Sequence, residues 1–170
     1  MLSRPKWGAD RDPERAGRHA AKLGATPQAA GWGGDDDTVD FASIRIITDD
    51  LEPVVQFYEE VTGVSAVHPA PVFAELHLPS CTIAFGHTQT AQLFNNSARP
   101  ADNHTVIIEF LVDDVDSEYE RLKPLVSEWV QEPTTMPWGN RSILFRDPDG
   151  NLVNLFTPVT EEAIKRFGSR

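Results

Sequence analysis

The sequence predicts an α+β fold of two βαβββ modules whose strands form a curved mixed sheet around a central cleft. An apolar strand, an Asp-Asp pair and an amphipathic helix occur twice in this order, with the pairs at Asp49-Asp50 and Asp113-Asp114. Three further extended segments follow each helix, and the offset from position 49 to position 113 is 64 residues. A single module leaves one sheet face bare, so two copies facing each other enclose a cleft, the default ligand site.

Composition excludes several classes of partner. The chain has 170 residues, a formal net charge of −11 and a pI near 4.8. Nucleic acids and anionic membranes bind basic patches, so neither is expected as a partner. No apolar segment approaches the roughly 20 residues of a membrane-spanning helix, and no signal-peptide core is visible. With a single cysteine, these features predict a cytoplasmic protein.

Residues 1–38 differ from the rest of the chain. They are rich in Gly, Ala, Arg and Asp, and residues 31–37 form an acidic, glycine-rich segment. Because they offer little apolar surface to bury, we predict a flexible tail. Trp7 and Trp32 are its bulky side chains, so a role of the tail in contacting a partner stays open.

The first module is predicted at residues 39–92. Phe41–Ile47 is apolar and β-branched, as strands are. Asp50 is a good helix N-cap, Pro53 suits the first helical turn, and Gly63 suits the C-terminal cap. The helix between them carries an apolar stripe at helical spacing: Val54, Phe57, Tyr58 and Val61. Strands are predicted at 64–68, 72–78 and 81–86.

The polar segment Thr88–Asn103 is predicted to cross the surface, with the linker itself at 93–104. The second module is predicted at 105–159. It begins with a strand at Thr105–Val112, and Asp114 caps a helix that Pro124 ends. Its helix stripe is Val115, Tyr119 and Leu122, and its later strands are 128–132, 142–145 and 152–156. A C-terminal extension at 160–170 is expected to form a short helix that covers an edge.

A tight turn at Asp147-Pro148-Asp149-Gly150 joins the last two strands. Pro148 presets φ for the first corner of the turn, and Gly150 accepts a positive φ. The Asp147 side chain can bind the backbone of its own turn. The segment therefore predicts a β-hairpin.

Together these segments resemble the vicinal oxygen chelate superfamily, which includes glyoxalases, extradiol dioxygenases, fosfomycin-modifying enzymes and bleomycin-binding proteins. The resemblance covers Phe41–Val159 and implies the glyoxalase/bleomycin resistance fold. It depends on the motifs Ile44-Arg45-Ile46-Ile47-Thr48-Asp49-Asp50-Leu51, Gln56-Phe57-Tyr58, Thr62-Gly63-Val64, and Pro137-Trp138-Gly139 followed by Asp147-Pro148-Asp149-Gly150-Asn151-Leu152-Val153. These motifs are specific to the superfamily and not to one activity.

Members that use a divalent metal place a His or Gln on each first strand and a Glu on each last strand. The resemblance maps these positions onto Ser43, Ile107, Ala84 and Asn154. A serine, two aliphatic residues and a neutral amide make a poor ligand set. We therefore expect no metal and no other cofactor, with one divalent metal as the alternative.

Strand alternation then gives the side chains expected to line the cleft. On the first and last strands these include Ser43, Arg45, Ile107, Glu109, Asn154 and Phe156. Arg45 and Glu109 hold equivalent positions in the two modules. They are expected either to form an ion pair or to anchor a ligand, with Arg45 donating to a carboxylate or amide.

Phe73, Glu75 and His77 share one face of another strand. Glu75 and His77 are expected to be either solvated groups on an edge strand or an acid–base pair. An off-pattern metal site would use Glu75, His77 and Glu109.

Two residues near the last hairpin complete the candidates. Trp138 either caps the core or stacks on a planar ligand. Arg141 pairs either with an anionic ligand or with the acidic surface of the protein itself.

The sequence thus predicts a protein that binds a small organic molecule between the modules without the usual metal site. The alternative is a metal-dependent lyase, isomerase or dioxygenase, so whether the protein is an enzyme stays open, and a third possibility is a partner-binding module. The resemblance also implies a homodimer, since members of the superfamily often pair.

Overall fold

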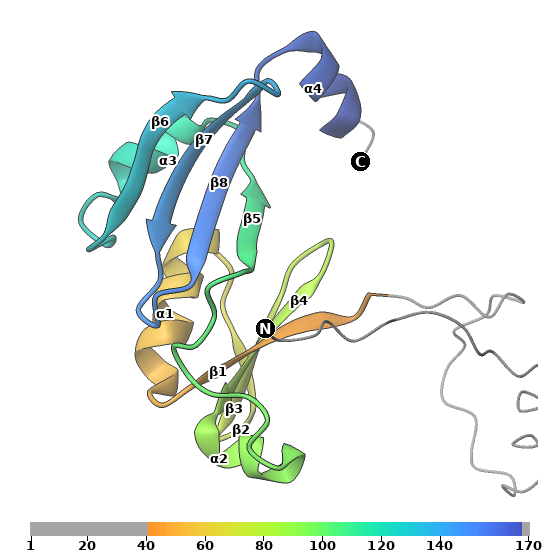
Figure 1. Ribbon diagram of the computed structural model, residues 1–170, viewed down its shortest axis with the longest axis vertical. Coiled ribbons are helices and arrows are strands. Elements are labelled where there is room, and N and C mark those ends of the chain that lie inside the picture. The colour runs from red at the N-terminus through yellow and green to blue at the C-terminus, as the bar shows by residue number, and fades with distance from the viewer. Residues whose placement is uncertain (1–40, 168–170) are drawn as a thin grey trace, which may run out of the picture. The chain divides into compact units, whose positions relative to one another are not determined.

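The computed structural model describes residues 41–167, and the tail predicted at residues 1–38 lies outside the described residues. The first module contains β1 (Ser43–Thr48), α1 (Leu51–Thr62), β2 (Val67–Ala70), β3 (Phe73–His77) and β4 (Thr82–His87). The second contains β5 (Ile107–Leu111), α3 (Val115–Leu122), β6 (Trp129–Thr135), β7 (Asn140–Arg146) and β8 (Leu152–Pro158). The repeated element order confirms the predicted pair of βαβββ modules (Figure 1).

Each module forms its own four-stranded sheet. The strand orders are β1-β4-β3-β2 and β5-β8-β7-β6. In both sheets the first strand runs parallel to the last, and the other neighbours are antiparallel. The single curved sheet expected from the sequence is therefore, in its hydrogen bonds, two mixed sheets.

The two long helices begin differently. Asp114 caps α3 as predicted, because its Oδ1 accepts from the backbone N–H groups of Asp116 and Ser117 at 3.0 and 3.3 Å. Asp50 holds the N-cap position of α1 but makes no side-chain cap, so that part of the prediction is wrong. Thr48 acts there instead, since its Oγ1 accepts from the Asp50 N–H at 3.2 Å.

The hydrophobic core lies where helices cover the sheets. Helix α1 packs on β3 and β4, while α3 packs on β6, β7 and β8. Every second strand residue is buried against these helices: Ile46, Ala74, Leu76, Ile83, Phe85, Ile108, Ile143, Phe145, Val153 and Leu155. Ile46 and Ile108 confirm the predicted strand parity. We call the other face of each sheet its open face.

The modules meet on the helix-covered side. The Phe57 and Phe145 rings, one from each module, lie 6.1 Å apart edge to face, and the Tyr58 and Phe110 rings lie 6.5 Å apart. The buried Tyr58 hydroxyl donates to Asp147 Oδ2 at 2.9 Å. Aromatic packing and a buried hydrogen bond therefore join the repeated units.

A short helical segment follows the last strand of each module. The polar segment Thr88–Asn103 begins as α2 (Thr88–Ala91) and the 3₁₀ helix η1 (Gln92–Phe94), two helical turns that the sequence pattern did not predict. A Cβ on Gly86 would lie 2.7 Å from Thr90 Oγ1, which places α2 against the open face of the first sheet. Helix α4 (Glu161–Phe167) takes the equivalent place, where Phe167 packs on Phe156 at 5.0 Å between ring centroids.

Burial and the Asp147 carboxylate raise the pKa of Tyr58 well above its ordinary value of 10.0. The folded state therefore holds a phenolic proton that the unfolded state releases. This contribution to stability is complete below about pH 10 and is lost as the pH rises further. We expect Tyr58→Phe to flatten the alkaline fall in stability, measured by urea unfolding between about pH 8 and about pH 11. Burial and the hydrogen bond to Glu132 also raise the pKa of Tyr119, but less, so Tyr119→Phe should flatten the alkaline slope less than Tyr58→Phe does. An unchanged alkaline slope in Tyr58→Phe would contradict the assignment.

None of the helices within residues 41–167 has the length and hydrophobicity needed to traverse a bilayer.

Candidate functional site

The open face of the first sheet brings five predicted residues together. Across β1, β4 and β3, Ser43 is level with Thr82 and His77, and Arg45 is level with Ala84 and Glu75. Phe73 lies in the next row, opposite Gly86. The small residues Thr82 and Ala84 on β4 thus lie between Arg45 on β1 and the side chains of Glu75 and His77 on β3.

Glu75 and His77 form a contact on this face. His77 Nε2 lies 3.5 Å from Glu75 Oε2, and His77 Nδ1 lies 3.2 Å from Thr82 Oγ1. The His77 side chain is 56% exposed. The imidazole therefore bridges a carboxylate and a hydroxyl while one side of the ring remains accessible to solvent.

Arg45 stacks on aromatic rings. Its Cζ lies 5.0 Å from the centre of the Phe73 ring and 5.7 Å from that of Phe94. Within residues 41–167, no ion pair joins Arg45 to a carboxylate. The Arg45–Glu109 ion pair considered from the sequence is therefore absent here, because each side chain makes contacts within its own module.

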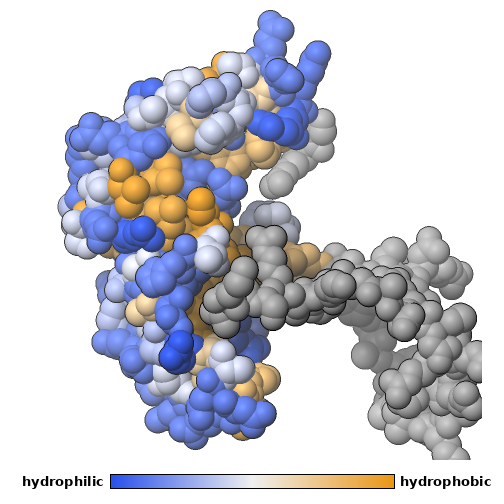
Figure 2. Space-filling view, in the orientation of Figure 1, coloured by the Kyte–Doolittle hydropathy of each residue, from blue (hydrophilic) through white to orange (hydrophobic). Residues whose placement is uncertain are grey.

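The open face of the second sheet is centred on Glu109 and Asn154. These residues are level across β5 and β8, and Asn154 Nδ2 donates to Glu109 Oε1 at 2.8 Å. Ile107 and Leu111 flank Glu109 on β5 and are 47% and 41% exposed. Figure 2 shows hydrophobic surface over the sheet of the second module. A polar pair is therefore set among apolar side chains that remain accessible.

In the described part of the chain, residues 41–167, three buried polar atoms on this face have no hydrogen-bond partner. They are Asn154 Oδ1, Ser142 Oγ and Asn140 Oδ1, in side chains that are 8%, 2% and 6% exposed. An unsatisfied buried polar atom costs about 1–3 kcal/mol, so native structures contain few of them. Sequence reasoning missed Asn140 and Ser142. The signal was their period-2 alternation with the apolar Ile143 and Phe145.

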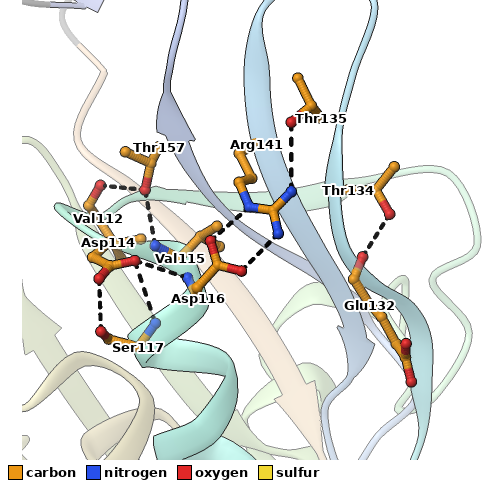
Figure 3. Close-up of polar contacts among 10 residues, drawn as sticks. All are labelled: Val112, Asp114, Val115, Asp116, Ser117, Glu132, Thr134, Thr135, Arg141 and Thr157. Carbon is orange, nitrogen blue, oxygen red and sulfur yellow. Dashed lines mark hydrogen bonds and ion pairs between the residues drawn. The ribbon is translucent and has the colours of Figure 1, made fainter.

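Arg141 lies on the helix-covered side of the second sheet, where its guanidinium points towards Asp116 (Figure 3). Its Nε and Nη2 donate to the Asp116 carboxylate at 2.6 and 2.7 Å. The hydrogen bond from Arg141 lowers the pKa of Asp116. Arg141 alternates with Ser142 and shares its face with Ile143, so strand parity places it on the α3 side. Of the two pairings considered for Arg141, the structure shows the one with the acidic surface of the protein.

Trp138 is also separate from the open-face residues. It is 55% exposed and lies beside Glu162, Lys165 and Arg166 around a shallow surface hollow. Its backbone carbonyl accepts from Arg166 Nη2 at 3.4 Å. Trp138 therefore does not cap the hydrophobic core.

The positions that hold metal in metal-dependent relatives do not fit a divalent ion here. Ser43 and Ala84 lie on neighbouring strands of the first sheet, while Ile107 and Asn154 lie on neighbouring strands of the second. They offer one hydroxyl and one amide, and Asn154 is already bonded to Glu109. Among residues 41–167, no three His, Cys, Asp or Glu side chains are grouped closely enough to hold a metal. The off-pattern set of Glu75, His77 and Glu109 is thus not brought together.

A pocket of about 190 Å³ lies between the two modules, at the edge of β1. Arg45 is the predicted binding residue that lines it. The remaining lining residues are Ile44, Ile46, Ile47, Ala98, Arg99, Ala101, Asp102, Asn103, Val106, Ile108 and Asn151. The pocket therefore involves the free edge of β1 and the segment that leads to β5, whereas most candidates lie on the open faces.

Comparisons with known proteins match the part of the chain that contains the two modules. Residues 40–155 match the model of the Glyoxalase/Bleomycin resistance protein/Dioxygenase superfamily. A glyoxalase/bleomycin resistance protein/dioxygenase from Nocardioides shares 24% identity at a TM-score of 0.62, over 74% of this chain and 87% of that one. A family enzyme from Burkholderia phytofirmans PsJN shares 18% identity at a TM-score of 0.62, over 71% and 100% of the two chains. A glyoxalase-related enzyme from Fulvimarina pelagi shares 21% identity at 0.61, over 69% and 87%. Among curated proteins, none matches significantly.

Proposed function

Because the chain belongs to the Glyoxalase/Bleomycin resistance protein/Dioxygenase superfamily, we propose that it binds a small organic molecule on the open faces of its sheets, through its own side chains. The observation that carries the proposal is the set of buried polar atoms on the open face of the second sheet that have no partner within residues 41–167: Asn154 Oδ1, Ser142 Oγ and Asn140 Oδ1. A bound molecule that donates hydrogen bonds would satisfy them. The apolar side chains of Ile107 and Leu111 beside Glu109 offer surface for its hydrophobic part.

A screen for binding tests this proposal. The probes are benzoate, benzamide, benzylamine and larger aromatic homologues of each, measured by thermal shift and then by calorimetry. We expect Asn154→Leu to weaken the best-binding probe that can donate a hydrogen bond, an amide or an amine, at least about tenfold, since a lost hydrogen bond to a buried group is worth about 1.4 kcal/mol. Thr135→Val removes a polar group from the other face of the same sheet and should leave affinity unchanged. Absence of binding by every probe, or equal loss in both variants, would sink the proposal.

We also propose that binding needs no divalent metal. The support is the donor chemistry at Ser43, Ala84, Ile107 and Asn154 described above. Elemental analysis of freshly purified protein should find less than stoichiometric Zn, Fe, Mn or Ni after dialysis, and EDTA should not alter the affinity of the best probe. A tightly held stoichiometric metal would overturn this part and favour the metal-dependent enzyme.

The Glu75–His77–Thr82 contact favours a second function, an enzyme of the lyase or isomerase type that uses acid–base chemistry. A carboxylate on one ring nitrogen favours one tautomer of the imidazole, and the exposed ring is placed to exchange a proton with a bound molecule. The test is exchange of carbon-bound hydrogen in a bound probe for deuterium from D₂O, followed by NMR. Exchange that His77→Gln abolishes would support catalysis. Exchange at the uncatalysed rate with wild-type protein would exclude it for that probe.

We further propose a homodimer. The first strands of both modules are edge strands in their sheets, and Ile107 and Leu111 on β5 are substantially exposed. A dimer that pairs these edge strands and covers these apolar side chains would remove surfaces that favour aggregation. Light scattering coupled to size-exclusion chromatography should give twice the 18.9 kDa chain mass, and a monomer at micromolar concentration would contradict the dimer.

A further inference from the structure

Arg45 is a cation held in place without a carboxylate. The chain carries 26 acidic residues against 15 basic ones, so an arginine lacking an acidic partner is unexpected. Among residues 41–167, Arg45 is held by the Phe73 and Phe94 rings instead, at 5.0 and 5.7 Å. Stacking of a guanidinium on aromatic faces fixes its plane while leaving the N–H groups at its edge free to donate.

Neighbouring residues on the open face leave room for the Arg45 guanidinium and do not pair with it. Gly86, beside Arg45 on the open face, has no side chain, and a Cβ there would lie 3.9 Å from Arg45 Cδ and 2.7 Å from Thr90 Oγ1. Glu75 is level with Arg45 across the sheet but contacts His77 instead. Among the described residues, the carboxylate level with Arg45 thus contacts another side chain, and no ion pair engages the N–H donors of Arg45.

A planar anion matches this arrangement. Guanidinium binds a carboxylate through two parallel N–H···O bonds, and this geometry is stronger and more selective than a single charged contact. Phe94 is 52% exposed beside the guanidinium, so an aromatic or aliphatic body attached to the carboxylate would find an apolar surface. The net charge of −11 repels anions at long range, so a preference for a carboxylate would have to arise from local contacts.

We infer that the small molecule bound by this protein carries a carboxylate, which Arg45 receives on the open face of the first sheet with Phe73 and Phe94 behind it. The inference rests on the proposed function, since the carboxylate is assigned to the molecule that the open faces bind. It narrows the ligand class to organic acids with an apolar body.

Benzoate and its neutral counterpart benzamide test the assignment, with affinities measured by calorimetry on the full chain. Wild-type protein should bind benzoate at least about tenfold more tightly than benzamide, and Arg45→Gln should remove that difference. Arg45→Lys keeps the charge but loses the planar fork, so it should recover only part of the difference. Arg141→Gln is the control, because it makes the same change in charge at a guanidinium that is already paired with Asp116 at 2.6 Å on the helix-covered side.

The possible outcomes separate this inference from the proposed function. If benzamide or benzylamine binds and responds to Asn154→Leu while benzoate is indifferent to Arg45→Gln, the carboxylate assignment is wrong and the proposed function stands. Equal loss in Arg141→Gln and Arg45→Gln would also overturn the assignment, since charge alone would explain it. If no probe binds, both proposals fail. Thermal unfolding of each variant checks that the fold is intact, and Arg45→Lys keeps the test decisive if Arg45→Gln is unstable.

Discussion

Asp147→Ala should lower the free energy of unfolding by about 3 kcal/mol or more. Asp147 is 5% exposed and accepts four hydrogen bonds. Its Oδ1 accepts from the backbone N–H groups of Asp149 and Asn151 at 3.0 and 2.7 Å. Its Oδ2 accepts from the Tyr58 hydroxyl at 2.9 Å and from Asn151 Nδ2 at 2.8 Å. Alanine would leave these donors in a buried place without an acceptor.

Urea unfolding of Asp147→Ala, Tyr58→Phe and the double variant measures this effect. Tyr58→Phe removes one donor without leaving an acceptor isolated, so it should cost only about 1 kcal/mol. The double variant should cost less than the sum of the single variants, because the two side chains share a hydrogen bond. Asp102→Ala, at an exposed ion pair, is the control and should be nearly neutral. If Asp147→Ala lowered the free energy of unfolding no more than Asp102→Ala does, the structural role of the turn would be refuted.

Phe145→Ala is the second large effect, with an expected loss of about 3–5 kcal/mol. Phe145 is fully buried on β7. Its ring lies 5.4 Å from that of Trp129 in the same module and 6.1 Å from that of Phe57 in the other. Truncation would therefore open a cavity where the two modules join, and the loss would affect the junction as well as the second core.

Denaturant unfolding followed separately by circular dichroism and by tryptophan fluorescence checks this result. Wild-type protein should unfold in one transition with both probes, and Phe145→Ala should shift that transition to lower denaturant. Val130→Ala on the neighbouring strand is the control, because Val130 is 48% exposed and its truncation should change little. If Phe145→Ala unfolded at the same denaturant concentration as wild-type protein, packing at the junction of the modules would contribute nothing to stability.

Local sequence patterns predicted the fold because each depends on neighbouring residues. Gly63 and Gly150 adopt φ values of 69° and 80°, as the predicted cap and turn require. Asp114 caps its helix through residues two and three positions away. The helical start of the Thr88–Asn103 segment was harder to predict, since the four residues of α2 are too few to display a helical period.

The candidate site was predicted only in part. Alternation along strands places Arg45 and Glu109 opposite the buried residues of β1 and β5, as expected. The partners of these side chains were not predictable, because Phe94 reaches Arg45 from a segment 49 positions later and Asn154 reaches Glu109 from 45 positions later. Arg141 could have been assigned correctly by applying the same alternation to β7.

By itself, the sequence determined the two repeated modules, the helix caps at Gly63 and Asp114, the hairpin turn and the face on which most strand residues lie. These properties follow from backbone preferences and side-chain periodicity over a few neighbouring residues. Only the tertiary structure decided that Arg45 stacks on aromatic rings, that Arg141 pairs with Asp116, and that Asn154 leaves an oxygen without a partner. Such contacts join residues distant in the chain, so they are decided by how side chains compete for space and for hydrogen bonds once the strands and helices have packed.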